Sequence, residues 1–328
     1  MNEPKVLFFS RDPGATNQLV AVHERLCCSP PSDAKAITAL RSRLSLSSDN
    51  HPQAVIVGKQ YALDVWRAAG IQAEDGAETT PDELIKRDIA LVVTGTDDID
   101  EPDTVSLWQA AQRSGIPVAV FLDNLVNLEA RFRTQDGELI TPDLIFVLDQ
   151  QSSAELTAAG MPPLRVQITE NLHLEHLKRI ANDHQDARKN IREAWQVGGA
   201  TKVILFASEN TAEMAAHGRT APYDEHAILG ALIGDLAQGK TVGGLQTGQD
   251  AVTVIIRPHP RDTAGKYDAS VSTAVPAVQV SSAGTPLEAI LAADLVAGMD
   301  SALLFEAQSL GQPALSLVAN SKFNEIFA

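Results

Sequence analysis

Cysteine and basic residues are scarce in this sequence of 328 residues. The two cysteines, Cys27 and Cys28, are adjacent and therefore poorly placed to form a disulfide with each other. Lysine and arginine number 26 against 42 aspartates and glutamates, for a formal net charge of -16. This charge argues against binding of nucleic acid or an anionic membrane through the overall field, although a local basic pocket is compatible with it. A small or neutral partner is expected.

Long hydrophobic runs are also absent from the sequence. No apolar stretch approaches the roughly 20 residues that a membrane span requires, and the N-terminal MNEPKVLFF has no basic region followed by a long apolar core. We therefore expect a cytoplasmic protein of a reducing compartment, without a membrane span. The length favours two domains, and 44% hydrophobic residues can supply a core for each.

Two catalytic sequence patterns are missing, and a third is present in the wrong context. Neither G-x-S-x-G nor G-x-G-x-x-G follows a strand, so serine hydrolase and NAD dehydrogenase interpretations lack support. GDLAQGKT, residues 234–241, fits the P-loop pattern. The apolar residues before it recur at helical spacing, however, whereas a P-loop follows a strand. This spacing predicts a helix that ends at Gly239, with no phosphate site there.

Short Val/Ile/Leu strands alternate with amphipathic helices along most of the chain. This order is typical of parallel sheets covered by helices on both faces. It predicts an α/β fold with two Rossmann-like doubly wound domains, at 1–168 and 199–328, joined by a polar connection at 169–198. The segment 29–53 has no firm strand and fits either a mobile surface loop or a weak helix.

In an open parallel sheet, ligands bind beyond the carboxyl ends of the strands. In VTVIIRPHPRD, the residues Arg257, His259 and Arg261 directly follow a strand and supply positive charge. In LVAGMDSALLFEAQSLG, Asp300 or Ser301 can cap the next helix, and the N–H groups of its first turn suit a phosphate.

These turns resemble the nucleotide-binding domain of GT-B glycosyltransferases, particularly the capsular-polysaccharide, sialyl and polyol-phosphate transferases. The stretches that carry the resemblance are RPHP, LEAILAADLVAGMDSALLFEAQSLGQPALSL, VQITENLHLEHL, SRDPGATNQL and LDNLVNLEARF. Glu170, Leu172 and Leu125 depart from the residues usual in such proteins. The resemblance implies that the two domains face a cleft that binds a nucleotide-activated donor.

The resemblance also implies roles for individual residues. His259 and Ser301, with neighbouring Asp300, would contact the donor phosphates, supported by Arg257, and Glu306 would bind the ribose. The charged groups, His259 included, would stabilise the departing nucleotide, so that neither a metal nor a cofactor is required. Asp12 or Asp123 would act as base towards an acceptor hydroxyl. The expected partners are a nucleotide-sugar or nucleotide-polyol donor and a small-molecule or glycan acceptor of polysaccharide biosynthesis.

Structural explanations compete with these roles. Ser301 can be a helix cap only, Asp12 a turn former, Asp123 the end of a strand, and Glu306 the partner of a neighbouring side chain. Ser208 and Glu209 follow the first strand of the second domain and can face the ligand or belong to an ordinary loop.

Two other functions are compatible with the sequence. A nucleotide-sugar 2-epimerase has the same architecture, and a non-catalytic nucleotide-binding protein can keep the fold without the chemistry. A metal site is not expected, because no pair among His173, Glu175, His176 and His184 has the H-E-x-x-H spacing.

Overall fold

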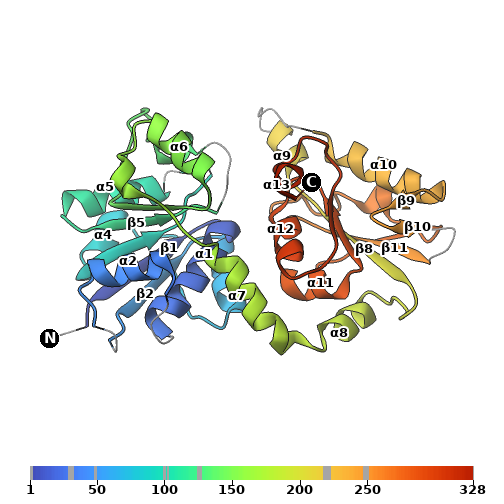
Figure 1. Cartoon of the computed structure of the whole chain (residues 1–328), viewed down its shortest axis with the longest axis horizontal. Coiled ribbons are helices and arrows are strands. Elements are labelled where there is room, and N and C mark those ends of the chain that lie inside the picture. Colours follow the sequence, from blue (N-terminus) through green and yellow to red (C-terminus); the bar gives the residue numbers. More distant parts are fainter. Residues whose placement is uncertain are drawn as a thin grey trace. The chain divides into compact units, whose positions relative to one another are not determined.

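The structure is a computed structural model that describes residues 3–28, 33–47, 50–98, 101, 103–123, 128–216, 223–246 and 251–327. The chain divides into two compact units, residues 1–176 (unit 1) and 177–328 (unit 2), and helix α7 (Leu172–Ile180) crosses the boundary (Figure 1). Within the described ranges, no helix is both long enough and apolar enough to cross a membrane.

Unit 1 contains a parallel sheet of seven strands in the order β3-β2-β1-β4-β5-β6-β7. The strands are β1 (Lys5–Ser10), β2 (Gln53–Gly58), β3 (Glu74–Asp75), β4 (Ile89–Thr94), β5 (Val118–Phe121), β6 (Leu144–Val147) and β7 (Val166–Ile168). The helical segments are α1 (Pro13–His23), η1 (Glu24–Cys28), α2 (Lys35–Arg43), α3 (Tyr61–Ala68), α4 (Pro81–Ile85), α5 (Asp103–Arg113), η2 (Glu129–Phe132), α6 (Gln150–Ala158) and η3 (Pro163–Arg165).

Both faces of this sheet are covered. Successive β1 side chains point to opposite faces, so that Leu7 packs in one core with Trp108 of α5 and Phe8 in a second core with Trp66 of α3. The strand therefore reads as a continuous apolar run instead of an alternating one.

The segment 29–53, for which the sequence leaves two alternatives, contains helix α2. Ile37 and Leu40 of α2 are fully buried against the core that includes Phe8. Tertiary burial of one helix face stabilises a segment whose propensity alone does not specify a helix.

Unit 2 contains a parallel sheet of five strands in the order β12-β11-β8-β13-β14. The strands are β8 (Lys202–Ala207), β11 (Val252–Arg257), β12 (Ala277–Val280), β13 (Leu295–Gly298) and β14 (Ala314–Ser316), beside a hairpin of β9 (Thr241–Val242) and β10 (Leu245–Gln246). The helical segments after α7 are η4 (Ala181–His184), α8 (Ala187–Ala194), α9 (Thr211–Ala216), α10 (Glu225–Ala237), η5 (Asp268–Ser270), α11 (Pro286–Ala292), α12 (Ala302–Ser309) and α13 (Lys322–Phe327).

Apolar cores cover both faces of this sheet too: Leu205 of β8 packs with the core that includes α11, and Phe206 with the core that includes α10. The predicted α/β fold with two doubly wound sheets is confirmed.

The P-loop pattern lies at the end of a helix, as the sequence predicts. Helix α10 ends at Ala237, and Gly239 follows with a φ of 74°, a left-handed conformation that glycine adopts without a steric cost. Lys240 Nζ lies 2.6 Å from Asp235 Oδ1. In GDLAQGKT, Gly239 therefore terminates helix α10, and Lys240 is an exposed lysine that pairs with Asp235.

Candidate functional site

The candidate nucleotide site in unit 2 is built on three adjacent strands, β11, β8 and β13. Parallel strands present their carboxyl ends at one edge of the sheet, so the loops after these three strands are neighbours. The loop after β11 carries His259, the loop after β8 carries Ser208 and Glu209, and the loop after β13 carries Asp300 and Ser301.

The His259 imidazole is neutral and has a defined tautomer. Its Nδ1 accepts a hydrogen bond from the backbone N–H of Arg261 at 3.1 Å, so the ring proton lies on Nε2. Burial lowers the pKa of His259 to about 4, although the carboxylate of Asp262 opposes this shift. At neutral pH His259 therefore offers an Nε2–H donor without a full charge.

Hydrogen bonds join the loop of His259 to the loop after β8. Asp262 Oδ2 accepts from the backbone N–H of His259 at 2.8 Å and from Ser208 Oγ at 2.7 Å. Ser208 Oγ also shares a hydrogen bond with the buried Tyr267 hydroxyl. Because Asp262 binds both the His259 backbone and Ser208, the position of His259 is coupled to the loop after β8.

Glu209 joins the loop after β8 to the loop after β13. Its Oε1 accepts from the backbone N–H of Asp300 at 2.7 Å, and its Oε2 accepts from the Tyr223 hydroxyl. Burial raises the pKa of Glu209, and the hydrogen bonds from Tyr223 and Asp300 oppose that rise. The three loops thus form one hydrogen-bonded assembly.

The two candidate caps of α12 have different roles. Ser301 is the N-cap, and its Oγ accepts from the Leu303 N–H at 3.3 Å. The Asp300 carboxylate turns instead to α13, where it accepts from the backbone N–H groups of Lys322 at 3.0 Å and Phe323 at 3.2 Å. Of the two alternatives from the sequence, capping of α12 belongs to Ser301, because Asp300 is engaged by a helix 22 residues later in the chain.

Arg257 and Glu306 are close enough for the charge of Glu306 to raise the pKa of the Arg257 guanidinium. The Arg257 guanidinium donates to the carbonyl oxygens of Ala283 at 3.2 Å and Gly284 at 3.0 Å. Burial lowers its pKa, and the negative charges of Glu306 and Glu288 oppose that shift. Glu306 is 5% exposed. A structural role for both residues is thus present, and their contacts with phosphate and ribose stay predictions.

Three aspartates meet at the carboxyl ends of β1, β4 and β5 in unit 1: Asp12, Asp97 and Asp123. The charge of Asp12 raises the pKa of both Asp97 and Asp123, although burial is the larger cause for each. A Cβ atom added to Gly14 would lie 2.2 Å from Asp123 Oδ2, so glycine is required for this carboxylate to approach the start of α1. Asp123 Oδ1 is buried and has no hydrogen-bond partner within the described part of the chain.

Asp97 is a candidate that sequence reasoning missed. It is 5% exposed and accepts a hydrogen bond from the Thr104 N–H at 2.8 Å. Burial raises its pKa to about 7, with smaller contributions in the same direction from Asp12 and Asp103, while the Thr104 bond opposes the rise. A pocket of about 440 Å³ has Asp97 and Arg131 among its lining residues. The available signal was position, because Asp97 follows β4 as Asp12 follows β1 and Asp123 follows β5.

The predicted catalytic residues therefore belong to separate units. Asp12 and Asp123 lie together in unit 1, and His259 lies in unit 2. Their catalytic roles stay predictions.

The histidines near the unit boundary pair with carboxylates. His176 Nδ1 lies 2.7 Å from Glu24 Oε2, and His184 Nδ1 lies 3.5 Å from Glu288 Oε1. Over the part of the chain that the structure describes, no group of three His, Cys, Asp or Glu side chains could hold a metal ion.

Comparison with solved structures identifies proteins of the same architecture. The UDP-GlcNAc 2-epimerase from Methanocaldococcus jannaschii in complex with UDP-GlcNAc and UDP is similar with a TM-score of 0.62 at 13% identity, over 98% of this chain and 86% of that chain. The chain shares its fold. The UDP-GlcNAc 2-epimerase from Neisseria meningitidis bound to UDP-GlcNAc gives a TM-score of 0.59 at 15% identity, over 98% and 85% of the two chains.

Anabaena Alr3699/HepE in complex with UDP-glucose gives a TM-score of 0.59 at 14% identity, over 99% of this chain and 82% of that chain. The fold is therefore GT-B-like, and two of these three structural neighbours are 2-epimerases. A scan against protein-family models finds no match, and a search of curated proteins finds none either.

Proposed function

We propose that this protein is an enzyme that acts on a UDP-sugar, and that its reaction is epimerisation at C2 of the sugar. The observation that carries the proposal is the aspartate group of unit 1, in which burial raises the pKa of Asp97 to about 7 and also raises the pKa of Asp123, and the charge of Asp12 acts on both. Fold similarity to UDP-GlcNAc 2-epimerases supports the substrate class.

The chemistry requires two groups that exchange protons near neutral pH. C2 of the sugar has no neighbouring carbonyl group to stabilise a carbanion, so loss of its proton is balanced by cleavage of the C1–O bond to UDP and formation of a C1=C2 double bond. Return of UDP to C1 and delivery of a proton to the opposite face of C2 then give the epimer. A general acid or base is most effective when its pKa lies near the working pH. Asp97 meets that condition, and Asp123 is a second buried carboxyl group whose pKa, like that of Asp97, the charge of Asp12 raises.

Nucleotide binding is assigned to unit 2. The neutral Nε2–H of His259 donates to a phosphate oxygen, the first turn of α12, which Ser301 caps, faces the second phosphate, and Arg257 adds positive charge. The Asp300 carboxylate binds α13 instead. Glu306 accepts from ribose hydroxyls. Hydrogen bonds to charged oxygens contribute about 1.5–3 kcal/mol each, enough for a few such contacts to hold a diphosphate.

A second candidate function is glycosyl or polyol-phosphate transfer. The stretches RPHP and DLVAGMDSALLFEAQ favour it through their resemblance to GT-B glycosyltransferases, and Asp12 or Asp123 would then take a proton from an acceptor hydroxyl. The two functions differ in one requirement, since transfer consumes an acceptor and epimerisation does not.

Incubation of the protein with UDP-GlcNAc in D₂O, without acceptor, distinguishes them. An epimerase forms the C2 epimer and introduces deuterium at C2 of both epimers, which proton NMR detects as loss of the H2 signal. Asp97→Asn is expected to slow this exchange at least 100-fold, in line with the usual contribution of general acid–base catalysis. Asp75→Asn, at an exposed aspartate that also accepts a backbone N–H, serves as the control.

Binding of UDP-GlcNAc without deuterium incorporation would reject the epimerase. Transfer of the sugar to an added glycan or polyol acceptor would then support the transferase function. If the sugar nucleotide stays unchanged with every acceptor, a non-catalytic binding protein is favoured.

A further inference from the structure

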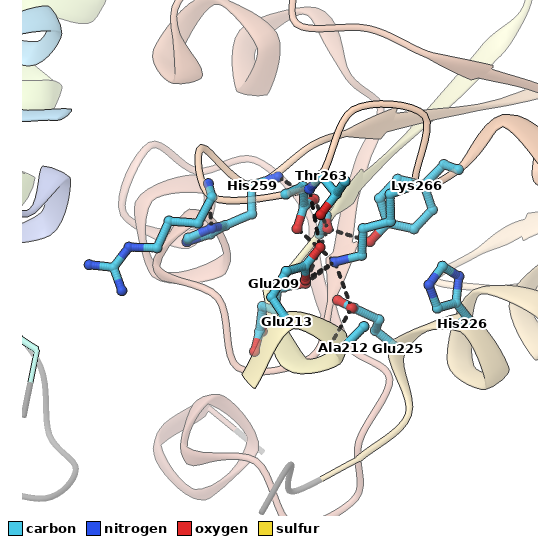
Figure 2. A network of polar contacts seen from close by, with 12 residues as sticks. Glu209, Ala212, Glu213, Glu225, His226, His259, Thr263 and Lys266 are labelled. Carbon is cyan, nitrogen blue, oxygen red and sulfur yellow. Dashed lines mark hydrogen bonds and ion pairs between the residues drawn. The ribbon is translucent and has the colours of Figure 1, made fainter. Parts of the chain in front are cut away.

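Lys266 is a buried lysine surrounded by acidic side chains from three parts of unit 2. Its side chain is 5% exposed, and its Nζ lies 2.6 Å from Asp262 Oδ1, 2.6 Å from Glu225 Oε1 and 2.8 Å from Glu213 Oε2 (Figure 2). We call these four residues the Lys266 cluster. Glu213 belongs to α9 and Glu225 to α10, whereas Asp262 belongs to the loop of His259.

Hydrogen bonds connect the Lys266 ammonium group, through Asp262 and Glu209, to the loop that carries His259 and to the loop that carries Asp300 and Ser301. Asp262 uses its other oxygen, Oδ2, to accept from the His259 N–H and from Ser208 Oγ. Lys266 Nζ also donates to the Glu209 carbonyl oxygen at 3.0 Å, and the Glu209 side chain holds the Asp300 N–H. One side chain therefore links the loops after β11, β8 and β13 through two short paths.

Glu213 adds a third tie to the same loop. Its Oε1 accepts from the Thr263 N–H at 3.1 Å while its Oε2 binds Lys266, so helix α9 holds the loop at two points (Figure 2). The backbone on both sides of Asp262 is thus bonded to the cluster, at His259 and at Thr263. A loop that carries two prolines and several charges is fixed in one conformation by these bonds.

We propose that Lys266 is a positioning residue for the nucleotide site: it fixes the loop that holds His259 as an Nε2–H donor and keeps Glu209 against Asp300 before a ligand arrives. This inference rests on the proposed function, since it assigns a role in binding UDP. Lys266 does not touch the ligand in this assignment and acts through Asp262 and Glu209. Pre-arranged donors bind without the ordering cost that a mobile loop would pay.

The charge of Lys266 also favours the neutral form of His259. Four groups contribute beside the burial that lowers the pKa of His259: Arg261 and Lys266 lower it, and Asp262 and Glu213 raise it. Removal of the ammonium eliminates one of the two lowering charges and frees the loop, which exposes the ring to water. Both changes move the pKa of His259 up, towards the usual value near 6.5.

The experiment combines nitrogen NMR of the His259 imidazole with calorimetric titration of UDP, on the full chain. In the wild type, the ¹⁵N shifts are expected to show an Nε2–H tautomer with a titration midpoint near pH 4. In Lys266→Met, the midpoint rises towards the usual value near 6.5, the tautomers become mixed, and the Kd for UDP increases about tenfold.

A second variant separates positioning from folding. Lys266→Met leaves the fully buried side chain of Glu225 without its ammonium partner, and an uncompensated buried charge is strongly destabilising. Lys266→Met/Glu225→Gln removes both charges, and the glutamine Oε1 keeps the bond from the Ala212 N–H. This double variant is expected to melt above Lys266→Met but below the wild type, because the Asp262 side chain, which is 2% exposed, also loses its ammonium partner. At a temperature where it is folded, it is expected to show the altered His259 and the weaker UDP binding. Lys240→Met, at an exposed lysine of the same unit, is the matched control and changes neither readout.

The outcomes are distinguishable. If the folded double variant keeps the wild-type His259 tautomer and midpoint and binds UDP within about twofold of the wild type, Lys266 serves only stability and the inference is wrong. A wild-type His259 with its proton on Nδ1 would also overturn it, without any variant. If the wild type does not bind UDP, the proposed function fails, and the NMR comparison still decides whether Lys266 positions His259.

Discussion

Asp97 allows a quantitative test of the candidate acid–base group, because the same burial that adjusts its pKa costs stability. Its pKa is raised from 3.8 to about 7 in the folded protein. At a pH between 3.8 and about 7, Asp97 has released its carboxyl proton in the unfolded chain but still holds it in the folded protein. The unfolded state then binds fewer protons, so the free energy of unfolding falls as the pH rises through this window and is level above it.

The size of this loss follows from the shift. A difference of about 3 pH units at about 1.4 kcal/mol for each unit corresponds to about 4 kcal/mol at pH 8. Asp97→Asn removes the ionisable group, and the asparagine Oδ1 can still accept from the Thr104 N–H. We therefore expect Asp97→Asn to stabilise unit 1 by up to about 4 kcal/mol at pH 8 and by about zero at pH 4, while it slows turnover at least about 100-fold.

Urea unfolding at pH 4, 6 and 8 measures this effect. Trp66 and Trp108 are fully buried in unit 1 and report on its unfolding, and a Trp195→Phe background removes the signal of unit 2. Asp75→Asn replaces an exposed aspartate that accepts the Ala77 N–H at 2.9 Å, and its stability should stay within about 0.5 kcal/mol of the background at each pH. A pH-independent effect of Asp97→Asn, or destabilisation at pH 8, would refute the assignment of Asp97 as a buried group that titrates near neutrality.

Three further predictions concern the nucleotide site. His259→Ala should raise the Kd for UDP about tenfold and leave uridine binding almost unchanged, because the lost hydrogen bond is to a charged phosphate; calorimetry that finds equal losses for both ligands contradicts the assignment. Ser301→Asp should abolish UDP binding by charge repulsion and keep the melting temperature, because aspartate caps helices as well as serine does; unaltered affinity would place the phosphates elsewhere. UDP binding should persist in EDTA, and its loss with recovery on adding Mg²⁺ would show that a metal is needed.

The sequence by itself determined most of the buried strands, and with them the edge of each sheet at which the candidate site residues follow a strand. It did not determine α2, which the tertiary burial of Ile37 and Leu40 stabilises. Periodicity assigned GDLAQGKT to the end of a helix, and α10 with Gly239 confirms this. Buried strands followed by Asp12, Asp123 or His259 were readable because a fully covered parallel strand is a continuous apolar run. Such local signals depend only on neighbours along the chain.

Only the tertiary structure decided which charged groups are buried and what they bind. Lys266 looks like a surface residue in the sequence, and one of its partners, Glu213, is 53 residues away. Asp97 resembles any acid after a strand until burial beside Asp12 and Asp103 raises its pKa. Desolvation and Coulomb interactions depend on distances in space, which sequence separation does not specify, so the roles of these side chains follow from the packing of the loops.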